Sequence, residues 1–112
     1  MRLLAAEIMR EKLFLNLHQE LPYQLTVETE KWEEQEDGSA TVNLSIYVAR
    51  EGHRGIILGK RGTTIRRIGM AARIELEEAL ERRIHLFSHV KVRKDWIDDA
   101  ARYSVWDLDY NA

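Results

Sequence analysis

The stretch ILGKRGTTIRRIG at residues 57–69 decides the fold, because two glycines enclose two cations directly before a helical pattern. Glycine permits the positive φ angles of a tight turn and leaves room for a second backbone to approach. The start of the following helix offers unpaired N–H groups and a partial positive charge, and both favour phosphate. Lys60 and Arg61 would project from the tip of the loop and add cationic contacts. The stretch therefore predicts an anion-binding turn between two helices.

Upstream of this loop, hydrophobic spacing predicts one helix and two strands. Residues 3–21 carry apolar side chains at four-residue intervals and on a second stripe, so this helix is expected to be apolar on two sides. Pro22 ends it, because proline lacks the N–H donor that a helix needs. Residues 25–32 and 42–48 alternate apolar and polar side chains, and an Asp-Gly pair at residues 37–38 predicts a turn that makes the two strands neighbours.

A short helix, a long helix and a third strand are expected around the loop and after it. Residues 52–62 hold four of the six glycines, around an apolar run at residues 56–58. The long helix covers residues 63–81 with apolar side chains at helical spacing, and the strand covers residues 84–93 with alternating ones. The order helix, strand, strand, short helix, glycine loop, helix, strand predicts an α+β domain with a three-stranded sheet.

The length and composition predict a single globular domain. We expect it to span residues 1–112, with a core at about residues 8–94 and a C-terminal helix or tail at residues 95–112. Hydrophobic residues are 45% and charged residues 32% of the chain, which excludes disorder. The chain has no cysteine, which excludes a disulfide framework, a thiolate zinc site and a cysteine nucleophile. Charges interrupt the leader-like start and no apolar run approaches the ~20 residues of a membrane span, so a cytoplasmic location is expected.

The formal net charge of −2 hides an uneven distribution of charge. Residues 28–37 contain six acids and one base, whereas residues 52–72 contain five bases and no acid. A single basic segment in an otherwise acidic chain is typical of a localised anion-binding site, although a solvated helix face gives the same count.

Neither a catalytic site nor a metal site is predicted. The glycine loop departs from the nucleotide-binding P-loop, because three residues rather than four separate Gly55 from Gly59 and because Arg61 stands where a Ser or Thr would bind magnesium. Triphosphate hydrolysis is therefore only a rival hypothesis. His85 and His89 would lie about 13 Å apart on a strand at ~3.3 Å per residue, too far to share one ion. We expect no catalytic residue and no cofactor in this chain.

The order of the elements and the Gly59–Gly62 loop resemble a type II KH domain (α-β-β-α-α-β), whose three-stranded mixed sheet is covered on one side by helices. In KH domains, a GxxG loop clamps the backbone of about four nucleotides of single-stranded nucleic acid. Further motifs make the chain similar to the C-terminal KH domain of the Era family of bacterial GTPases over roughly residues 10–99. These motifs are REKL at 10–13, ELPY at 20–23, VE at 27–28, IG at 68–69, AR at 72–73, HL at 85–86, VKV at 90–92 and Trp96.

The resemblance implies a binding domain that is not itself an enzyme. The guanine-nucleotide motifs of the family do not occur in these 112 residues, so we expect one domain of a longer GTPase, with a Met1 that is not native. The implied partners are the single-stranded 3′ end of 16S ribosomal RNA, the small (30S) ribosomal subunit during its assembly, and the N-terminal GTPase domain of the parent protein. Two alternatives stay open: a protein-interaction module that docks a GTPase domain or ribosomal protein without RNA affinity, and a weak membrane-surface association peripheral to the inner membrane.

The resemblance also implies which residues bind the RNA. The GxxG loop would grip the phosphates, apolar residues of the short helix would floor the groove for the bases, and the third strand would form one edge. Phe87 either stacks on a base or packs under a helix, and packing is the favoured interpretation. The candidate RNA-binding residues are Arg54, Ile56, Ile57, Gly59, Lys60, Arg61, Gly62, Thr63, Arg66 and Lys91.

Overall fold

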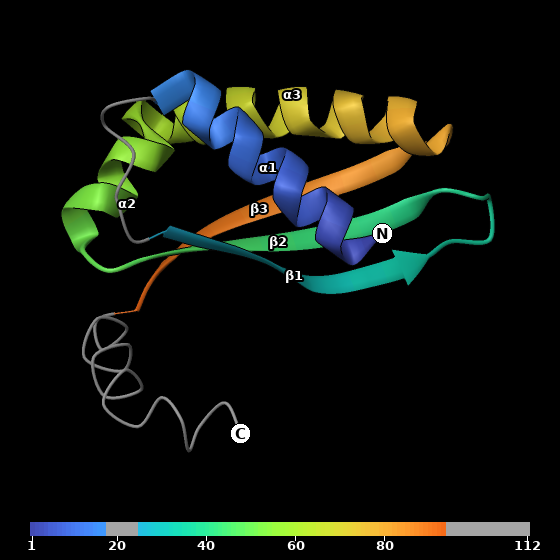
Figure 1. Ribbon diagram of the computed structural model, residues 1–112, viewed down its shortest axis with the longest axis horizontal. Coiled ribbons are helices and arrows are strands. Elements are labelled where there is room, and N and C mark those ends of the chain that lie inside the picture. Colours follow the sequence, from blue (N-terminus) through green and yellow to red (C-terminus); the bar gives the residue numbers. More distant parts are fainter. Residues whose placement is uncertain (18–24, 94–112) are drawn as a thin grey trace, which may run out of the picture.

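The computed structural model describes residues 1–17 and 25–93, and Figure 1 shows their arrangement. The elements follow in the order α1 (Arg2–Leu17), β1 (Leu25–Glu34), β2 (Ala40–Val48), α2 (Glu51–Leu58), a 3-10 turn (Lys60–Gly62), α3 (Thr63–Leu80) and β3 (Ile84–Val92). This order confirms the α+β fold expected from the sequence.

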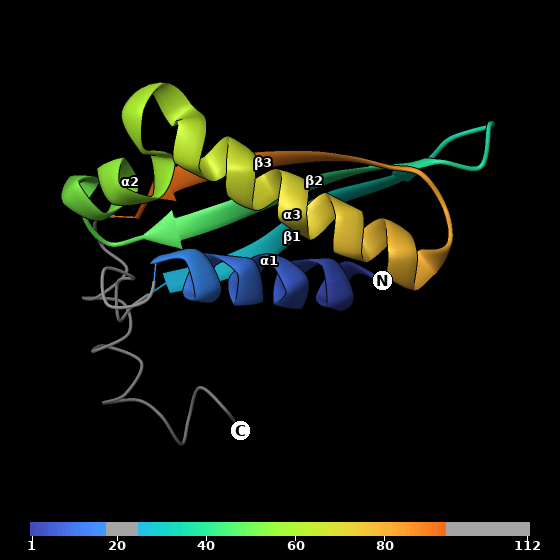
Figure 2. The same ribbon diagram turned by 90° about the horizontal axis from the view of Figure 1, so that it is seen from above.

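The three strands form one mixed sheet in the order β1-β2-β3. β2 pairs antiparallel with β1 and parallel with β3, so the chain crosses from β2 to β3 through α2 and α3. The two long helices cover one face of the sheet, with α1 packed against β1 and α3 packed against β3 (Figures 1 and 2). Among the described residues, no helix covers the opposite face.

The hydrophobic core lies between the sheet and this helix layer. Every second residue of β2 is buried there, while Thr41 and Asn43 between them lie on the other face and are half-buried. The helices contribute buried residues at the three- and four-residue spacing of an amphipathic helix. The core residues from these elements include Met9, Leu13, Ala40, Val42, Leu44, Ile46, Val48, Ile68, Ala72 and Leu76.

Side chains of α1 form hydrogen bonds with the main chain of β1, which is one edge strand of the sheet. At the outer edge of β1, two arginines of α1 donate to main-chain carbonyls: Arg2 Nη1 lies 3.1 Å from Thr29 O, and Arg10 Nη1 lies 3.0 Å from Leu25 O. Such contacts occupy carbonyls that could otherwise pair with another chain. The other edge of the sheet is β3, which runs beside α3.

Two expectations extend beyond the described residues. The helix expected over residues 3–21 is helical to Leu17, and Pro22 lies within residues 18–24, outside the described residues. The tail at residues 95–112, with Trp96, also lies outside them. In the part of the chain that is described, no helix is long and apolar enough to cross a membrane.

Candidate nucleic-acid interface

The GxxG loop has a backbone shape that requires glycine at its first position. Gly59 has φ 71° and ψ −175°, and a Cβ placed there would lie 2.0 Å from Thr64 Oγ1. Gly62 has φ 73°, and its N–H donates to Gly59 O at 3.2 Å, which closes the turn. Both conformations are ones that side chains with a Cβ rarely adopt. The two glycines therefore fix the path by which the chain leaves α2 and enters α3.

The two cations between the glycines are presented to solvent. Lys60 and Arg61 are exposed, and Arg61 itself has φ 55°, a left-handed conformation that costs a non-glycine residue roughly 1–2 kcal/mol. Thr63 Oγ1 donates to Lys60 O at 2.8 Å and ties the turn to the first residue of α3. The loop thus holds both cations in a strained but braced turn, directly before a helix N-terminus.

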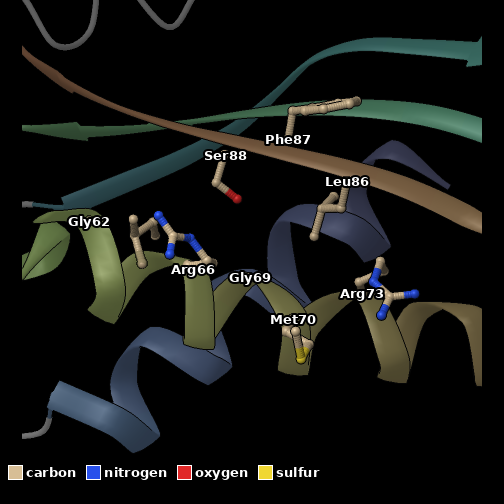
Figure 3. Close-up of a pocket in the computed structure, with 9 residues that line it drawn as sticks. Gly62, Arg66, Gly69, Met70, Arg73, Leu86, Phe87 and Ser88 are labelled. Carbon is tan, nitrogen blue, oxygen red and sulfur yellow. The ribbon is translucent and has the colours of Figure 1, made fainter.

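A groove runs from this loop along the line where α3 faces β3, with a cavity of about 440 Å³ (Figure 3). On this line Gly69 of α3 faces Ser88 of β3, and a Cβ at Gly69 would make an ordinary contact of 3.5 Å with Ser88 Oγ. Figure 3 shows Leu86 and Ser88 directed from β3 toward α3, whereas Phe87 points away from the helix. We call this feature the α3–β3 groove; it is lined by Gly62, Ile65, Arg66, Gly69, Met70, Arg73, Leu86, Phe87 and Ser88.

Counting only residues 1–17 and 25–93, the main chain of β3 offers hydrogen-bonding groups without a partner to this groove. Arg93 N–H donates to Val48 O at 2.8 Å, so the odd-numbered residues of β3 bond to β2. The main-chain groups of the even-numbered residues then point to the free edge, because these directions alternate along a strand. Leu86 and Ser88 are the even-numbered residues in the middle of the groove wall. Their N–H and C=O groups make the wall an alternating row of donors and acceptors.

Side chains cap this edge at both ends of the row. Glu77 Oε2 accepts from Ile84 N–H at 2.8 Å, and Arg54 Nε donates to Val90 O at 3.2 Å. An unpaired main-chain group that loses water on burial is costly, so caps of this kind protect the fold. Between the two caps, the edge at Leu86 and Ser88 stays open to a ligand that supplies its own hydrogen bonds.

The positive charge that is free to meet an anion gathers at the loop end of the groove. In the described part of the chain, Arg54 pairs with Glu51 at 2.9 Å and Arg73 pairs with Glu77 at 3.0 Å. The salt bridges of the described residues include none from the cations nearest to the loop, which are Lys60, Arg61, Arg66 and Arg67. The described residues hold no group of three His, Asp or Glu side chains suited to a metal ion.

The structure brings some of the sequence-predicted residues to the groove and not others. Gly62 and Arg66 line it. Ile57 has no exposed surface and is part of the core, and Ile56 is exposed on α2 outside the groove lining. Lys91 projects from the face of β3 that is turned away from the helices, where its Nζ lies 5.8 Å from the centre of the Tyr47 ring.

Arg54 and Phe87 also differ from expectation in their surroundings. Arg54 is occupied by the Val90 carbonyl and the Glu51 carboxylate, so it is an edge cap as well as a cation. Phe87 is 52% exposed on the open face of the sheet, and the prediction that it packs under a helix is wrong. It faces away because odd-numbered residues of β3 point to the side that carries no helix among the described residues.

Sequence reasoning missed most of the α3 side of the groove wall. Gly69, in the middle of a helical pattern, was a usable signal, because glycine inside a helix often marks a close approach. The strand residues gave no comparable signal, since only the sheet order shows that β3 is an edge. The resemblance implied β3 as one edge of the groove without singling out Leu86 or Ser88, and the residues that were missed are Ile65, Gly69, Met70 and Arg73.

Comparison with known proteins agrees with this geometry. The family model of the KH domain matches residues 20–97. The chain is 54% identical over 110 residues to GTPase Era of Dinoroseobacter shibae, covering 98% of this chain and 36% of that protein. It is 56% identical over 110 residues to GTPase Era of Brucella suis, covering 98% of this chain and 35% of that protein. The chain thus spans about a third of the length of the curated relatives it matches.

Two solved structures of Era match with a TM-score of 0.78 and 38% sequence identity, over 85% of this chain and 32% of each matched chain. One is a variant of the Aquifex aeolicus protein bound to GDP·AlF4−, and the other is a complex with MgGDPNP and nucleotides 1506–1542 of 16S ribosomal RNA. The resemblance expected from the sequence is confirmed, as is the expectation of a binding domain rather than an enzyme. The chain belongs to the KH domain family, and within that family it is similar to the KH domain of the Era GTPases.

Proposed function

We propose that this chain binds single-stranded RNA in the α3–β3 groove, without catalysing a reaction. The observation that carries the proposal is the β3 edge at Leu86 and Ser88, which lies near the GxxG loop, whose cations have no salt-bridge partner among the described residues. Nucleobases that are free of a duplex carry both donors and acceptors on their Watson–Crick edges. Such edges can satisfy the main-chain row of β3, while the sugar-phosphate backbone follows the loop.

The phosphates are assigned to the loop end of the groove. Lys60 and Arg61 stand on the turn, Gly59 and Gly62 give it its shape, and Arg66 follows one turn later on α3. Thr63 adds a braced hydroxyl at the start of the helix. A strand held in this way would have its bases directed at Leu86 and Ser88 and its charge directed at the loop.

The RNA proposed as ligand is the 3′ end of small-subunit ribosomal RNA. Support comes from the similar Era structure that contains nucleotides 1506–1542 of 16S ribosomal RNA. A role in assembly of the 30S subunit, and an N-terminal GTPase domain in the same protein, belong to the same proposal, because the chain spans only 36% of its relative. We further propose that residues 1–112 act as one domain, with a core at about residues 8–94.

A second candidate function is protein docking on the outer face of α1. Phe14 and Leu15 are 59% and 54% exposed there, beside a hollow of about 320 Å³ that Glu7, Arg10 and Glu11 also line. Exposed apolar patches rimmed by charges are typical of interaction sites. Binding to this face would be insensitive to substitutions in the GxxG loop, which separates it from RNA binding by the groove.

Fluorescence anisotropy tests the main proposal. The ligands are a labelled ~10-nucleotide strand with the sequence of the 16S ribosomal RNA 3′ end, a scrambled strand of equal composition, and a duplex of the first strand. With about three phosphate contacts, log K should fall with log salt at a slope near −2, at roughly −0.7 per contact. Preferential, salt-weakened binding of the first strand is expected. Equal binding of the duplex, or no binding of any strand, would overturn the proposal.

A further inference from the structure

The α3–β3 groove continues past Arg73 into a second cavity of about 510 Å³. Three residues, Arg73, Leu86 and Phe87, line both spaces, so the two cavities are direct neighbours along β3. The remaining residues that line the second cavity are Glu77, Arg83, Ile84 and His85.

Among the charged residues that line this second cavity, two are arginines and one is a carboxylate. Arg73 and Arg83 are the cations of its lining, and Glu77 is the single acid of its lining. His85 adds an imidazole ring to the same lining. Without Glu77, this cavity would resemble a continuation of the phosphate-binding path. The affinity of this cavity for an anion therefore depends on the contacts that the Glu77 carboxylate makes.

Both oxygens of Glu77 are engaged, and its side chain is only 24% exposed. Oε1 accepts from Arg73 Nη1 at 3.0 Å, and Oε2 accepts from Ile84 N–H at 2.8 Å. The first contact neutralises the arginine that both cavities share. The second closes the β3 edge to a nucleobase at the point where the second cavity begins.

From these contacts we infer that Glu77 ends the RNA-binding path: its charge keeps the phosphodiester backbone out of the second cavity and confines the strand to the α3–β3 groove. The inference rests on the proposed function and adds to it a residue that sets how many nucleotides are bound. A half-buried carboxylate cancels the charge of its partner Arg73 more fully than an exposed one would, because solvent screens the pair less.

The substitution Glu77→Gln tests this inference. Glutamine keeps a side-chain oxygen for Ile84 N–H but carries no charge, so Arg73 becomes available to a phosphate. Glu78→Gln is the matched control, because it makes the same charge change on the next residue of α3, at an exposed position. Thermal unfolding of each variant reports whether the fold is kept.

Affinity is measured for RNA strands lengthened one nucleotide at a time, separately at the 5′ and the 3′ end. In the unsubstituted chain and in Glu78→Gln, affinity should stop rising at the same length. In Glu77→Gln, further nucleotides at one end only should add about tenfold in affinity, and the salt slope should steepen by about 0.7 for one more phosphate contact. Identical length series for Glu77→Gln and Glu78→Gln would overturn the inference.

Arg83→Gln gives a second test. The single variant is informative even if Glu77→Gln does not fold. If Glu77 excludes phosphate, Arg83→Gln alone leaves RNA affinity unchanged, and in the Glu77→Gln background it removes the gain. A loss of affinity from Arg83→Gln alone would show that the strand already reaches the second cavity and would overturn the inference. Absence of RNA binding by the unsubstituted chain would instead overturn the proposed function.

Discussion

Gly59 and Thr64 lie so close that no larger residue fits at the first position of the loop: a Cβ on Gly59 would stand 2.0 Å from Thr64 Oγ1 and 2.5 Å from Thr64 Cβ. Gly62 has a similar φ of 73°, but a Cβ there would have no heavy atom within 4 Å. The two glycines of the GxxG loop are therefore required for different reasons. Gly59 is needed for its space and its backbone angles, and Gly62 for its backbone angles alone.

Gly59→Ala should destabilise the fold more than Gly62→Ala. We expect the free energy of unfolding to fall by about 3 kcal/mol for Gly59→Ala, because a steric clash adds to backbone strain, and by about 1 kcal/mol for Gly62→Ala, where only strain acts. Urea denaturation followed by circular dichroism measures both. Equal losses for the two variants would contradict the close contact between Gly59 and Thr64.

The cations of the loop should govern RNA affinity and not stability. The double variant Lys60→Asp with Arg61→Asp should abolish RNA binding while leaving the circular dichroism spectrum unchanged, because both side chains are exposed and make no salt bridge among the described residues. The single variants Lys60→Gln and Arg61→Gln should each flatten the salt slope by about 0.7.

Lys31→Asp is the control for these charge changes. Lys31 is exposed on β1, and its partner is Glu33 at 3.0 Å on the same strand, away from the groove. Its reversal should change RNA affinity less than twofold. If Lys31→Asp weakens binding as much as the double variant Lys60→Asp with Arg61→Asp does, general charge rather than the loop attracts the RNA, and the role assigned to the loop is wrong.

The sequence predicts the order of the elements well, because each element carries its own periodic pattern. Alternation in β2 and helical spacing in α3 reflect burial against one core, so local reading is enough to find them. The GxxG loop could be predicted for a similar reason, since its glycines and cations are adjacent in the chain. These parts of the site need no knowledge of distant contacts.

The wall of the groove could not be predicted in this way, because it depends on sheet order. Leu86 and Ser88 matter through their main-chain groups, and these are free only because β3 lies at an edge of the sheet. The short run at residues 56–58 shows a related limit of periodicity. Three consecutive apolar residues do not reveal which one turns inward, and the structure buries Ile57 while leaving Ile56 at 37% exposure.

Arg82 should contribute to stability by joining the α3–β3 turn to the β1–β2 hairpin. Its guanidinium donates to Gly38 O at 2.9 Å, to Ser39 O at 3.0 Å and to the Glu34 carboxylate. Arg82→Ala should lower the free energy of unfolding by about 1–2 kcal/mol, since two main-chain carbonyls and the Glu34 carboxylate lose charge-assisted hydrogen bonds. Lysine has no planar fork, so Arg82→Lys should restore less than half of the loss in urea denaturation. Full recovery with lysine would contradict a role for the guanidinium geometry.

Acid should destabilise the same hairpin through its carboxylates. Hydrogen bonds from Arg82 and then Trp32 lower the pKa of Glu34 below its ordinary 4.5, and the hydroxyl of Tyr47 lowers the pKa of Glu30 in the same direction. Ser39 lowers the pKa of Asp37 below 3.8. Because the folded-state pKa values are depressed, the unfolded chain takes up protons first as the pH falls. The stability that these carboxylates contribute is therefore present above about pH 4.5 and is lost progressively below it.

Glu34→Gln isolates one of these contributions. The variant should unfold more easily than the unsubstituted chain at pH 7, and the two free energies of unfolding should draw together as the pH falls below 4.5, because Glu34 then loses its charge in the unsubstituted chain as well. Glu36→Gln, at an exposed position in the same hairpin, serves as the control and should keep the full pH dependence. Urea denaturation at pH 7, 5, 4 and 3 measures all three proteins. Protonation can remove stability only if the ionised form of Glu34 supplies it. A difference in the free energy of unfolding between Glu34→Gln and the unsubstituted chain that stays constant across this range would therefore show that the Arg82–Glu34 contact stabilises the hairpin without the charge of Glu34.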